Sequence, residues 1–253
     1  MKKELRRWMR KGYFYIKQKR QKMSNGITLT FYMKENTESE DLLVIYSALP
    51  VKGSSVYNYV RTLDDVNCNK LYILDDFGEN RAGVFYLGEN GTMDVRDAVK
   101  ELITNIQKNK KIQHTFFSGT SKGGFAALYL GIDMQVDKII VGSPIVKVKH
   151  FLQDTEEKRA VYRGITGEKE KYEYNHLLLQ RIQEQQFDGE IYLQYSELEE
   201  IYENQIDELV ETLEKNKYTL SKENGMYSKH LDTRFFFPMY LRKIFNTSDR
   251  NGV

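Results

Sequence analysis

Residues 119–124 read GTSKGG, so Ser121 stands between two glycines in the pattern G-x-S-x-G. An apolar strand pattern precedes this segment (residues 114–118, HTFFS), and a helical pattern of small residues follows it (residues 122–130). A strand that turns abruptly into a helix holds such a serine in a strained backbone conformation, with its hydroxyl clear of the sheet. Glycine is needed beside it because larger side chains would collide with neighbouring backbone. The pattern predicts a nucleophilic serine, Ser121.

A Gly-rich turn between a strand and a helix also has a second interpretation. Doubly wound folds use such turns to bind a phosphate at the helix N-terminus, or only to pack closely. The segment matches neither G-x-G-x-x-G nor G-x-x-x-x-G-K-[ST], the patterns that predict nucleotide binding. We therefore favour the nucleophile, and keep a phosphate-binding protein without esterase activity as an alternative.

A serine nucleophile needs a histidine as general base and an acid that orients it, in the chain order serine, acid, histidine. Of the four histidines, only His230 follows the last predicted strand and precedes the closing helix. We predict it as the base, and the alternative is a surface histidine. Three carboxylates follow the strand pattern at residues 190–195, and the distance past the strand end favours Glu199 over Glu197 and Glu200. All three could instead be solvated residues that open a helix.

Acyl transfer also needs hydrogen-bond donors for the oxyanion that forms on the carbonyl. We expect one donor to be the backbone N–H of Lys122, the residue after the nucleophile. The second donor should come from the loop after residues 42–48 (LLVIYSA), where we favour the N–H of Ala48. Each donor of this kind stabilises the transition state by about 3 kcal/mol.

Strand and helix patterns alternate along the chain after the first 22 residues. Strand patterns occupy residues 27–33, 42–48, 71–76, 114–118, 138–142, 190–195 and 218–221. Helical patterns occupy residues 54–63, 95–106, 122–130, 206–213 and 237–245. Because the connections are too long for hairpins, the chain is predicted to form an α/β fold with a mainly parallel sheet and helices on both faces.

Two segments depart from this alternation of strands and helices, a basic segment at residues 1–22 and a charged helical segment at residues 146–187. Residues 1–22 hold ten Lys or Arg and one acid, a formal charge of +9 in a chain whose net charge is +2. In one interpretation, this segment contacts anionic lipid or an acidic partner. In the other, which we favour, it is a solvated helix packed on the domain by Trp8 and Phe14. Residues 146–187 carry helical spacing without a strand. We interpret them as a helical cap within one domain spanning residues 23–253, with ordinary surface helices as the alternative.

Composition excludes several other classes of protein. Hydrophobic residues make up 40% of the 253 residues and charged ones 29%, which indicates a globular protein rather than a disordered one. The single cysteine, Cys68, excludes an intrachain disulfide and a Cys-based zinc site. Asp75 and Asp76 lack further ligands at metal-binding spacing, so capping or loop hydrogen bonding is favoured for them. We expect a cytoplasmic protein, peripheral to the membrane if the basic segment binds lipid, with no metal, no cofactor and no nucleic-acid partner.

The predicted nucleophile, acid and base together resemble the α/β-hydrolase superfamily over residues 27–245. Three segments, DDFG at residues 75–78, GVFYLG at residues 83–88 and GTSKGG, are similar to a bacterial branch of it. That branch is found in capsular-polysaccharide biosynthesis clusters and, as an acetyltransferase component, in the accessory Sec secretion system. Typical hydrolases carry a His-Gly pair after the strand at residues 42–48, where this chain has Tyr46 and Ser47.

The resemblance implies a Ser–Glu–His set, which suits Ser121, Glu199 and His230. We expect acyl transfer through an acyl-Ser121 intermediate, to water in an esterase or to a sugar hydroxyl in an O-acetyltransferase. The resemblance further implies an acylated small molecule or a surface glycan as substrate. The alternative is a non-catalytic interaction protein on a hydrolase scaffold, which uses its basic segment to dock in a polysaccharide or secretion assembly.

Overall fold

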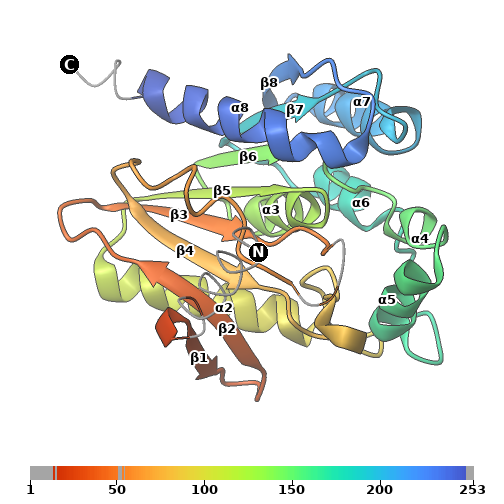
Figure 1. Ribbon diagram of the computed structural model, residues 1–253, viewed down its shortest axis with the longest axis horizontal. Coiled ribbons are helices and arrows are strands. Elements are labelled where there is room, and N and C mark those ends of the chain that lie inside the picture. Colours follow the sequence, from red (N-terminus) through yellow and green to blue (C-terminus); the bar gives the residue numbers. More distant parts are fainter. Residues whose placement is uncertain (1–13, 15, 51–52, 54, 249–253) are drawn as a thin grey trace, which may run out of the picture.

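Eight strands form one sheet, in the order β1-β2-β4-β3-β5-β6-β7-β8 (Figure 1). The computed structural model describes residues 14, 16–50, 53 and 55–248. The strands are β1 (Lys19–Lys22), β2 (Thr28–Lys34), β3 (Asp41–Tyr46), β4 (Asn69–Leu74), β5 (His114–Thr120), β6 (Lys138–Gly142), β7 (Glu190–Tyr195) and β8 (Thr219–Asn224). The strands from β3 to β8 are parallel, whereas β1 and β2 pair antiparallel at one edge. The mainly parallel sheet predicted from the sequence is confirmed.

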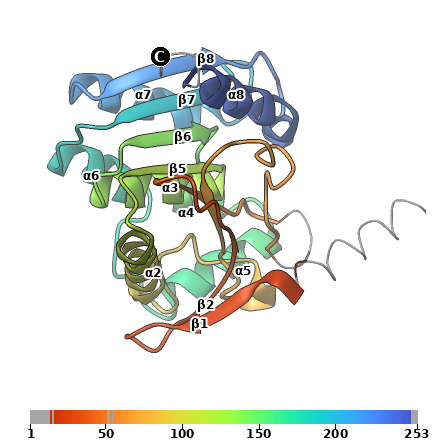
Figure 2. The same cartoon turned by 90° about the vertical axis from the view of Figure 1, so that its left-hand side faces the viewer.

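Helices cover both faces of this sheet. They are α2 (Asp94–Lys110), α3 (Lys122–Asp133), α4 (Val148–Phe151), α5 (Glu156–Thr166), α6 (Leu177–Glu184), α7 (Asp207–Lys215) and α8 (Thr233–Ser248), with short turns η1 (Glu79–Arg81), η2 (Tyr202–Ile206) and η3 (His230–Asp232). Figure 2 shows α2 and α3 on one side of the sheet and α8 on the other. Two buried clusters follow this division, one reaching α2, α3, α6 and α7, and the other reaching α8.

The helix predicted at residues 95–106 is α2, and its sequence explains which face it buries. Val95, Val99 and Leu102 recur at helical spacing and are all buried. Acidic residues stand in its first turn and lysines in its last, where each sign is favoured by the helix dipole. Burial of each of these three apolar side chains stabilises the fold by about 1.5–3 kcal/mol, so the stripe fixes α2 against the sheet.

The helix predicted at residues 54–63 is wrong. The described part of this range, residues 55–63, forms a loop with turns, and Tyr59 has a left-handed φ of 57°. Its aromatic side chains pack against rings from separate parts of the fold rather than along one helical face. The Tyr59 ring lies 5.2 Å from the Phe237 ring, and the Tyr57 ring lies 6.4 Å from the Tyr72 ring. These tertiary contacts override the helical spacing of the apolar residues.

Part of the basic segment also differs from its predicted helix. Lys19–Lys22 forms the edge strand β1, whose residues are exposed and whose backbone pairs with β2. The predicted packing through Phe14 is present, because its ring lies 5.4 Å from Tyr32 and 5.2 Å from Tyr57. Trp8 lies outside the described residues. Within the part of the chain that the structure describes, no helix is long and apolar enough to cross a bilayer.

Residues 146–187 contain the helices α4, α5 and α6 and no strand, as their spacing predicts. Figure 1 shows α4 and α5 beyond the carboxyl ends of the parallel strands. Helix α6 instead packs beside α3 on one face of the sheet. The first two helices of this segment are therefore the ones placed near loops that follow the strands, where α/β folds bind ligands.

Candidate active site

Ser121 lies at the sharp bend between β5 and α3. Its backbone angles are φ 54° and ψ −120°, a conformation that is strained for a residue with a side chain. Backbone hydrogen bonds hold this strain in place. The Ser121 N–H donates to the carbonyl of Gly142 at 3.1 Å, and the Ser121 carbonyl accepts from the N–H groups of Phe125 and Ile145 at 3.1 Å each. The bend predicted from the G-x-S-x-G pattern is thus present in the fold.

The glycines around the serine allow backbone segments to approach one another. A Cβ atom on Gly119 would lie 2.4 Å from the carbonyl of Gly123, and one on Gly123 would lie 2.5 Å from the carbonyl oxygen of Tyr46. Both distances are far below ordinary contact, and in each case the obstacle is backbone. The two flanking glycines are therefore needed for close packing of β5, α3 and the end of β3.

Replacing Gly119 by alanine should destabilise the protein. The new methyl group would overlap the backbone of Gly123, and overpacking of this kind costs about 1–3 kcal/mol. Urea denaturation followed by circular dichroism measures the change in free energy of unfolding. Gly164→Ala is the matched control, because its nearest neighbour outside α5 is 3.8 Å away and alanine favours a helix interior. A Gly119→Ala protein as stable as Gly164→Ala would contradict this account of the bend.

Three side chains form one line of hydrogen bonds at this bend. The Ser121 Oγ lies 2.8 Å from His230 Nε2, and His230 Nδ1 lies 2.5 Å from Glu199 Oε1. The Glu199 carboxylate is an acceptor, so Nδ1 carries the hydrogen and Nε2 can accept the serine proton. The Glu199 side chain is fully buried and the His230 side chain is 14% exposed. The arrangement can remove a proton from Ser121 and stabilise the resulting imidazolium.

The geometry separates Glu199 from the two carboxylates beside it. A turn in which the Glu199 N–H donates to the Ser196 carbonyl at 3.1 Å follows β7, and the Glu199 side chain faces the interior. Glu197 is exposed. Glu200 is also exposed and accepts a hydrogen bond from the backbone N–H of His230 at 2.9 Å. Of the three, Glu199 is the one that contacts the imidazole ring.

The other oxygen of Glu199 is held by Ser143, which in turn contacts Tyr227, and sequence reasoning missed both residues. The Ser143 hydroxyl donates to Glu199 Oε2 at 2.6 Å, and Tyr227 OH lies 2.6 Å from Ser143 Oγ. Burial raises the pKa of Tyr227 to about 12, helped by the nearby Glu199 charge, so the phenol keeps its proton and can donate it to Ser143. The carboxylate is thus fixed on both sides. No spacing in the sequence signals these contacts, which join three separate loops.

Helix α4 brings an aromatic ring to the proposed base. The Phe151 ring lies 6.0 Å from the imidazole ring of His230, in an edge-to-face arrangement. The ammonium of Lys158 in α5 stands 3.7 Å from the centre of the same Phe151 ring. Part of the segment at residues 146–187 therefore contacts the site directly. Phe151 shields one side of the imidazole from water.

The two predicted oxyanion donors, the N–H groups of Lys122 and Ala48, differ in their hydrogen bonding. Lys122 is the first residue of α3, where backbone N–H groups have no acceptor inside the helix and point past its N-terminus. The Ala48 N–H, in contrast, donates to the side-chain oxygen of Asn58 at 2.9 Å. An oxyanion bound by Ala48 must therefore replace the Asn58 oxygen. Sequence reasoning missed Asn58, which it placed in a helix.

Neither aspartate at the end of β4 is arranged as a metal ligand. Asp75 forms a buried ion pair with Lys122, and Asp76 pairs with Arg81 and accepts from Thr30. Among the described residues, no group of histidine, cysteine and acidic side chains could hold a metal ion. Cys68 is buried, and desolvation raises the pKa of its thiol to about 11. Both aspartates therefore form ion pairs, and within the described part of the chain only Asp75 of the two accepts hydrogen bonds from loop backbone, those of Val84 and Tyr86.

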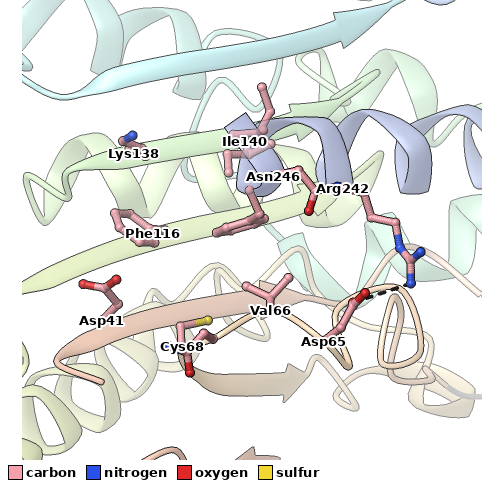
Figure 3. Close-up of a pocket in the computed structure, with 12 residues that line it drawn as sticks. Asp41, Asp65, Val66, Cys68, Phe116, Lys138, Ile140, Arg242 and Asn246 are labelled. Carbon is pink, nitrogen blue, oxygen red and sulfur yellow. Dashed lines mark ion pairs between the residues drawn. The ribbon is translucent and has the colours of Figure 1, made fainter. Parts of the chain in front are cut away.

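Figure 3 shows a pocket beside the start of β6, whereas Ser121 follows the end of β5. Its lining combines the start of β3, β5 and β6 with α8, through Asp41, Phe116, Lys138 and Arg242 among others. The residues of the hydrogen-bonded line at the bend do not line it. The hydrogen-bonded side chains of Ser121, His230 and Glu199 therefore lie at the carboxyl ends of the strands, on the side of α4 and α5.

Solved structures with the same architecture include a bacterial capsule O-acetyltransferase and a bacterial serine hydrolase. The capsule O-acetyltransferase of Neisseria meningitidis serogroup A matches with a TM-score of 0.72 and 20% identity, over 87% of this chain and 95% of that one. The fluorophosphonate-binding serine hydrolase FphF of Staphylococcus aureus matches with a TM-score of 0.66 and 11% identity, over 90% and 96%. These similarities show that the fold is α/β-hydrolase-like, as the sequence predicts.

The remaining comparisons concern a glycosylation-associated protein complex and a protein family. The glycosylation-associated Gap123 complex of Streptococcus agalactiae matches with a TM-score of 0.71 and 17% identity, over 91% of this chain and 47% of that one. No curated protein matches the sequence. Residues 66–233, which include the bend and His230, match the uncharacterised protein family UPF0227. The fold of this chain is α/β-hydrolase-like, and the chain belongs to the uncharacterised protein family UPF0227.

Proposed function

We propose that this protein transfers acyl groups through a covalent acyl-Ser121 intermediate. One observation carries the proposal: a continuous hydrogen-bonded line from Ser121 through His230 to Glu199, at a strained bend between a strand and a helix. Nucleophilic catalysis by serine requires this arrangement of nucleophile, base and orienting acid.

The first half of the reaction forms the acyl-enzyme. Ser121 Oγ attacks the acyl carbonyl carbon while its proton passes to His230 Nε2. Glu199 stabilises the imidazolium, and the Lys122 N–H donates to the oxyanion of the tetrahedral intermediate. When the intermediate collapses, the bond from carbon to the leaving group breaks and Nε2 returns the proton to that group. The acyl group is then an ester on Ser121.

The second half releases the acyl group to an acceptor hydroxyl. The hydroxyl oxygen attacks the ester carbonyl and gives its proton to His230 Nε2. Collapse of the second intermediate breaks the bond to Ser121, whose oxygen takes the proton back. With water the product is a carboxylic acid, and with a sugar hydroxyl it is an acylated sugar. The same residues serve both outcomes.

We further propose O-acetylation or deacetylation of a glycan as the finer activity. The capsule O-acetyltransferase of Neisseria meningitidis supports it, since this chain covers 95% of that enzyme's chain at a TM-score of 0.72. A mutant of that enzyme was solved in complex with CoA and matches with a TM-score of 0.74. Acetyl-CoA is therefore the acyl donor to test first, with p-nitrophenyl acetate as a donor that any serine esterase can use.

A fluorophosphonate probe tests the proposal directly. The expected result is one probe molecule per chain, on the peptide that contains Ser121, as read by intact mass and peptide mapping. Folded protein that carries no adduct would overturn the proposal and favour the non-catalytic interaction protein. Acetyl-CoA and p-nitrophenyl acetate are then compared with and without a saccharide acceptor. Acetate release that the acceptor does not reduce would indicate hydrolysis, and acetylated saccharide would indicate transfer.

A further inference from the structure

A fully buried ion pair lies directly beneath the bend at Ser121, and the acyl-transfer mechanism does not use it. The Lys122 ammonium donates to Asp75 Oδ2 at 2.9 Å and to the carbonyl of Ala82 at 3.3 Å. Both side chains of the pair are 0% exposed. Desolvation lowers the pKa of Lys122, and the neighbouring Asp75 opposes that effect. Replacing a buried pair by apolar residues is often neutral or stabilising, so stability alone does not explain this one.

Asp75 organises the loop that carries the GVFYLG segment. Both of its carboxylate oxygens accept from the N–H of Val84 at 2.9 Å, and Oδ2 also accepts from the N–H of Tyr86 at 3.2 Å. Phe85 and Tyr86 each have a left-handed φ of 57°. Successive N–H groups of such a curled backbone form a concave anion site. The Asp75 carboxylate occupies that site and holds the curl.

Gly83 allows the ion pair to approach this loop. Its φ is 112°, and a Cβ atom there would lie 2.2 Å from Lys122 Nζ and 2.5 Å from Asp75 Oδ2. A side chain at this position would therefore occupy the space of the pair itself. The segments DDFG and GVFYLG, separate in the sequence, thus form one unit with the lysine that follows the nucleophile.

Tyr86 connects this unit to the end of β3. Its hydroxyl accepts from the Ser47 N–H at 2.6 Å and lies 2.9 Å from the Ser47 hydroxyl. It donates to the carbonyl of Ile73 at 2.8 Å. Ser47 immediately precedes Ala48. Buried hydrogen bonds therefore run from the side chain of Lys122, through Asp75 and Tyr86, to the residue beside the second predicted oxyanion donor.

We propose that Lys122, Asp75 and Tyr86 are positioning residues that fix the distance between the two sides of the oxyanion hole. This inference rests on the acyl-transfer function proposed above. At one end of the network is the side chain of Lys122, whose backbone N–H is the first predicted oxyanion donor. At the other end, Tyr86 holds the backbone of Ser47, which precedes the second predicted donor, Ala48. Buried, fully paired networks of this kind specify one arrangement of the segments they join.

The test uses Tyr86→Phe, because Lys122→Met or Asp75→Asn leaves a buried charge without its partner and risks loss of the fold. Tyr86→Phe keeps the ring and removes the hydroxyl that holds Ser47. Tyr46→Phe is the matched control. Tyr46 is equally buried, its ring lies 5.0 Å from the Tyr86 ring, and its hydroxyl has no hydrogen-bond partner among the described residues. Thermal unfolding confirms that both variants are folded at the assay temperature.

In Tyr86→Phe, kcat for p-nitrophenyl acetate should fall by about 10-fold to 100-fold, because a displacement on the order of 1 Å at a reacting centre costs about 100-fold. KM and the pH profile of kcat should stay as in the wild type, since the hydrogen bonds of Tyr86 described above involve neither His230 nor Glu199. Tyr46→Phe should keep the wild-type kcat. A folded Tyr86→Phe protein with the kcat of Tyr46→Phe overturns this inference alone. A wild-type protein with no turnover and no Ser121 adduct overturns the proposed function and this inference with it.

Discussion

Replacing Ser121 by alanine should reduce kcat for an activated ester by about 10⁶-fold, the effect expected when the nucleophile of a serine enzyme is removed. The variant should also lose its fluorophosphonate adduct. The reason is that His230 Nε2 then lacks the hydroxyl that it is placed to activate. Steady-state kinetics with p-nitrophenyl acetate, supported by single-turnover measurements, report the change. Residual activity within tenfold of the wild type would mean that acyl transfer does not pass through this serine.

Ser118→Ala is the matched control for that experiment. Ser118 stands on the same strand, β5, three residues before the nucleophile. It is fully buried, and its hydroxyl has no hydrogen-bond partner within the described residues. Its removal should leave both turnover and labelling unchanged. A comparable loss in both variants would point to damage of β5 rather than to chemistry at residue 121.

Replacing Glu199 by glutamine should lower kcat by about 10⁴-fold, the loss known when the acid of such a triad becomes an amide. An amide can no longer stabilise the charged imidazole, and its NH₂ group can favour the tautomer that presents a hydrogen to Ser121. The buried position of Glu199 and its 2.5 Å contact with His230 Nδ1 are the basis of this expectation. Stopped-flow measurement of acyl-enzyme formation shows the loss at the chemical step.

The two neighbouring acids provide internal controls for Glu199→Gln. Glu197→Gln changes an exposed side chain and should leave kcat unchanged. Glu200→Gln keeps an oxygen that can accept from the His230 N–H, the bond seen at 2.9 Å, so the loss should stay below about tenfold. If Glu197→Gln or Glu200→Gln proved the most damaging of the three, Glu199 would not be the orienting acid.

The three groups of the proposed triad were accessible from the sequence because each is tied to a strand end. Ser121 follows the apolar run of β5, and the acids follow β7. His230 follows β8, the last strand. Parallel strands bring these three ends to one edge of the sheet, so chain order and strand patterns are sufficient to place them together. The choice among three glutamates depended on one turn after β7, which the sequence does not specify.

The contacts that support the site could not be predicted from the sequence, for a physical reason. Ser143 contacts Glu199 across 56 residues, and Tyr227 contacts Ser143 across 84. Such contacts depend on how loops curl rather than on periodicity. Asn58 lies in a segment whose apolar spacing suggests a helix but whose aromatic rings find separate partners. Asp75 was recognised only as a loop residue. Its pairing with Lys122 joins residues 47 positions apart and needs the space that Gly83 leaves.

The position of His230 immediately before α8 determines when the site is completed during synthesis. The nucleophile leaves the ribosome 109 residues ahead of its base. The base is held in place by α8, which packs on the sheet through Phe237 and Leu241. Because chains emerge from their N-terminus and fold in that order, a nascent chain ending before α8 has its serine but no anchored imidazole. We therefore expect the proposed acyl transfer to require α8, and a chain that stops before this helix should not turn over an acyl donor.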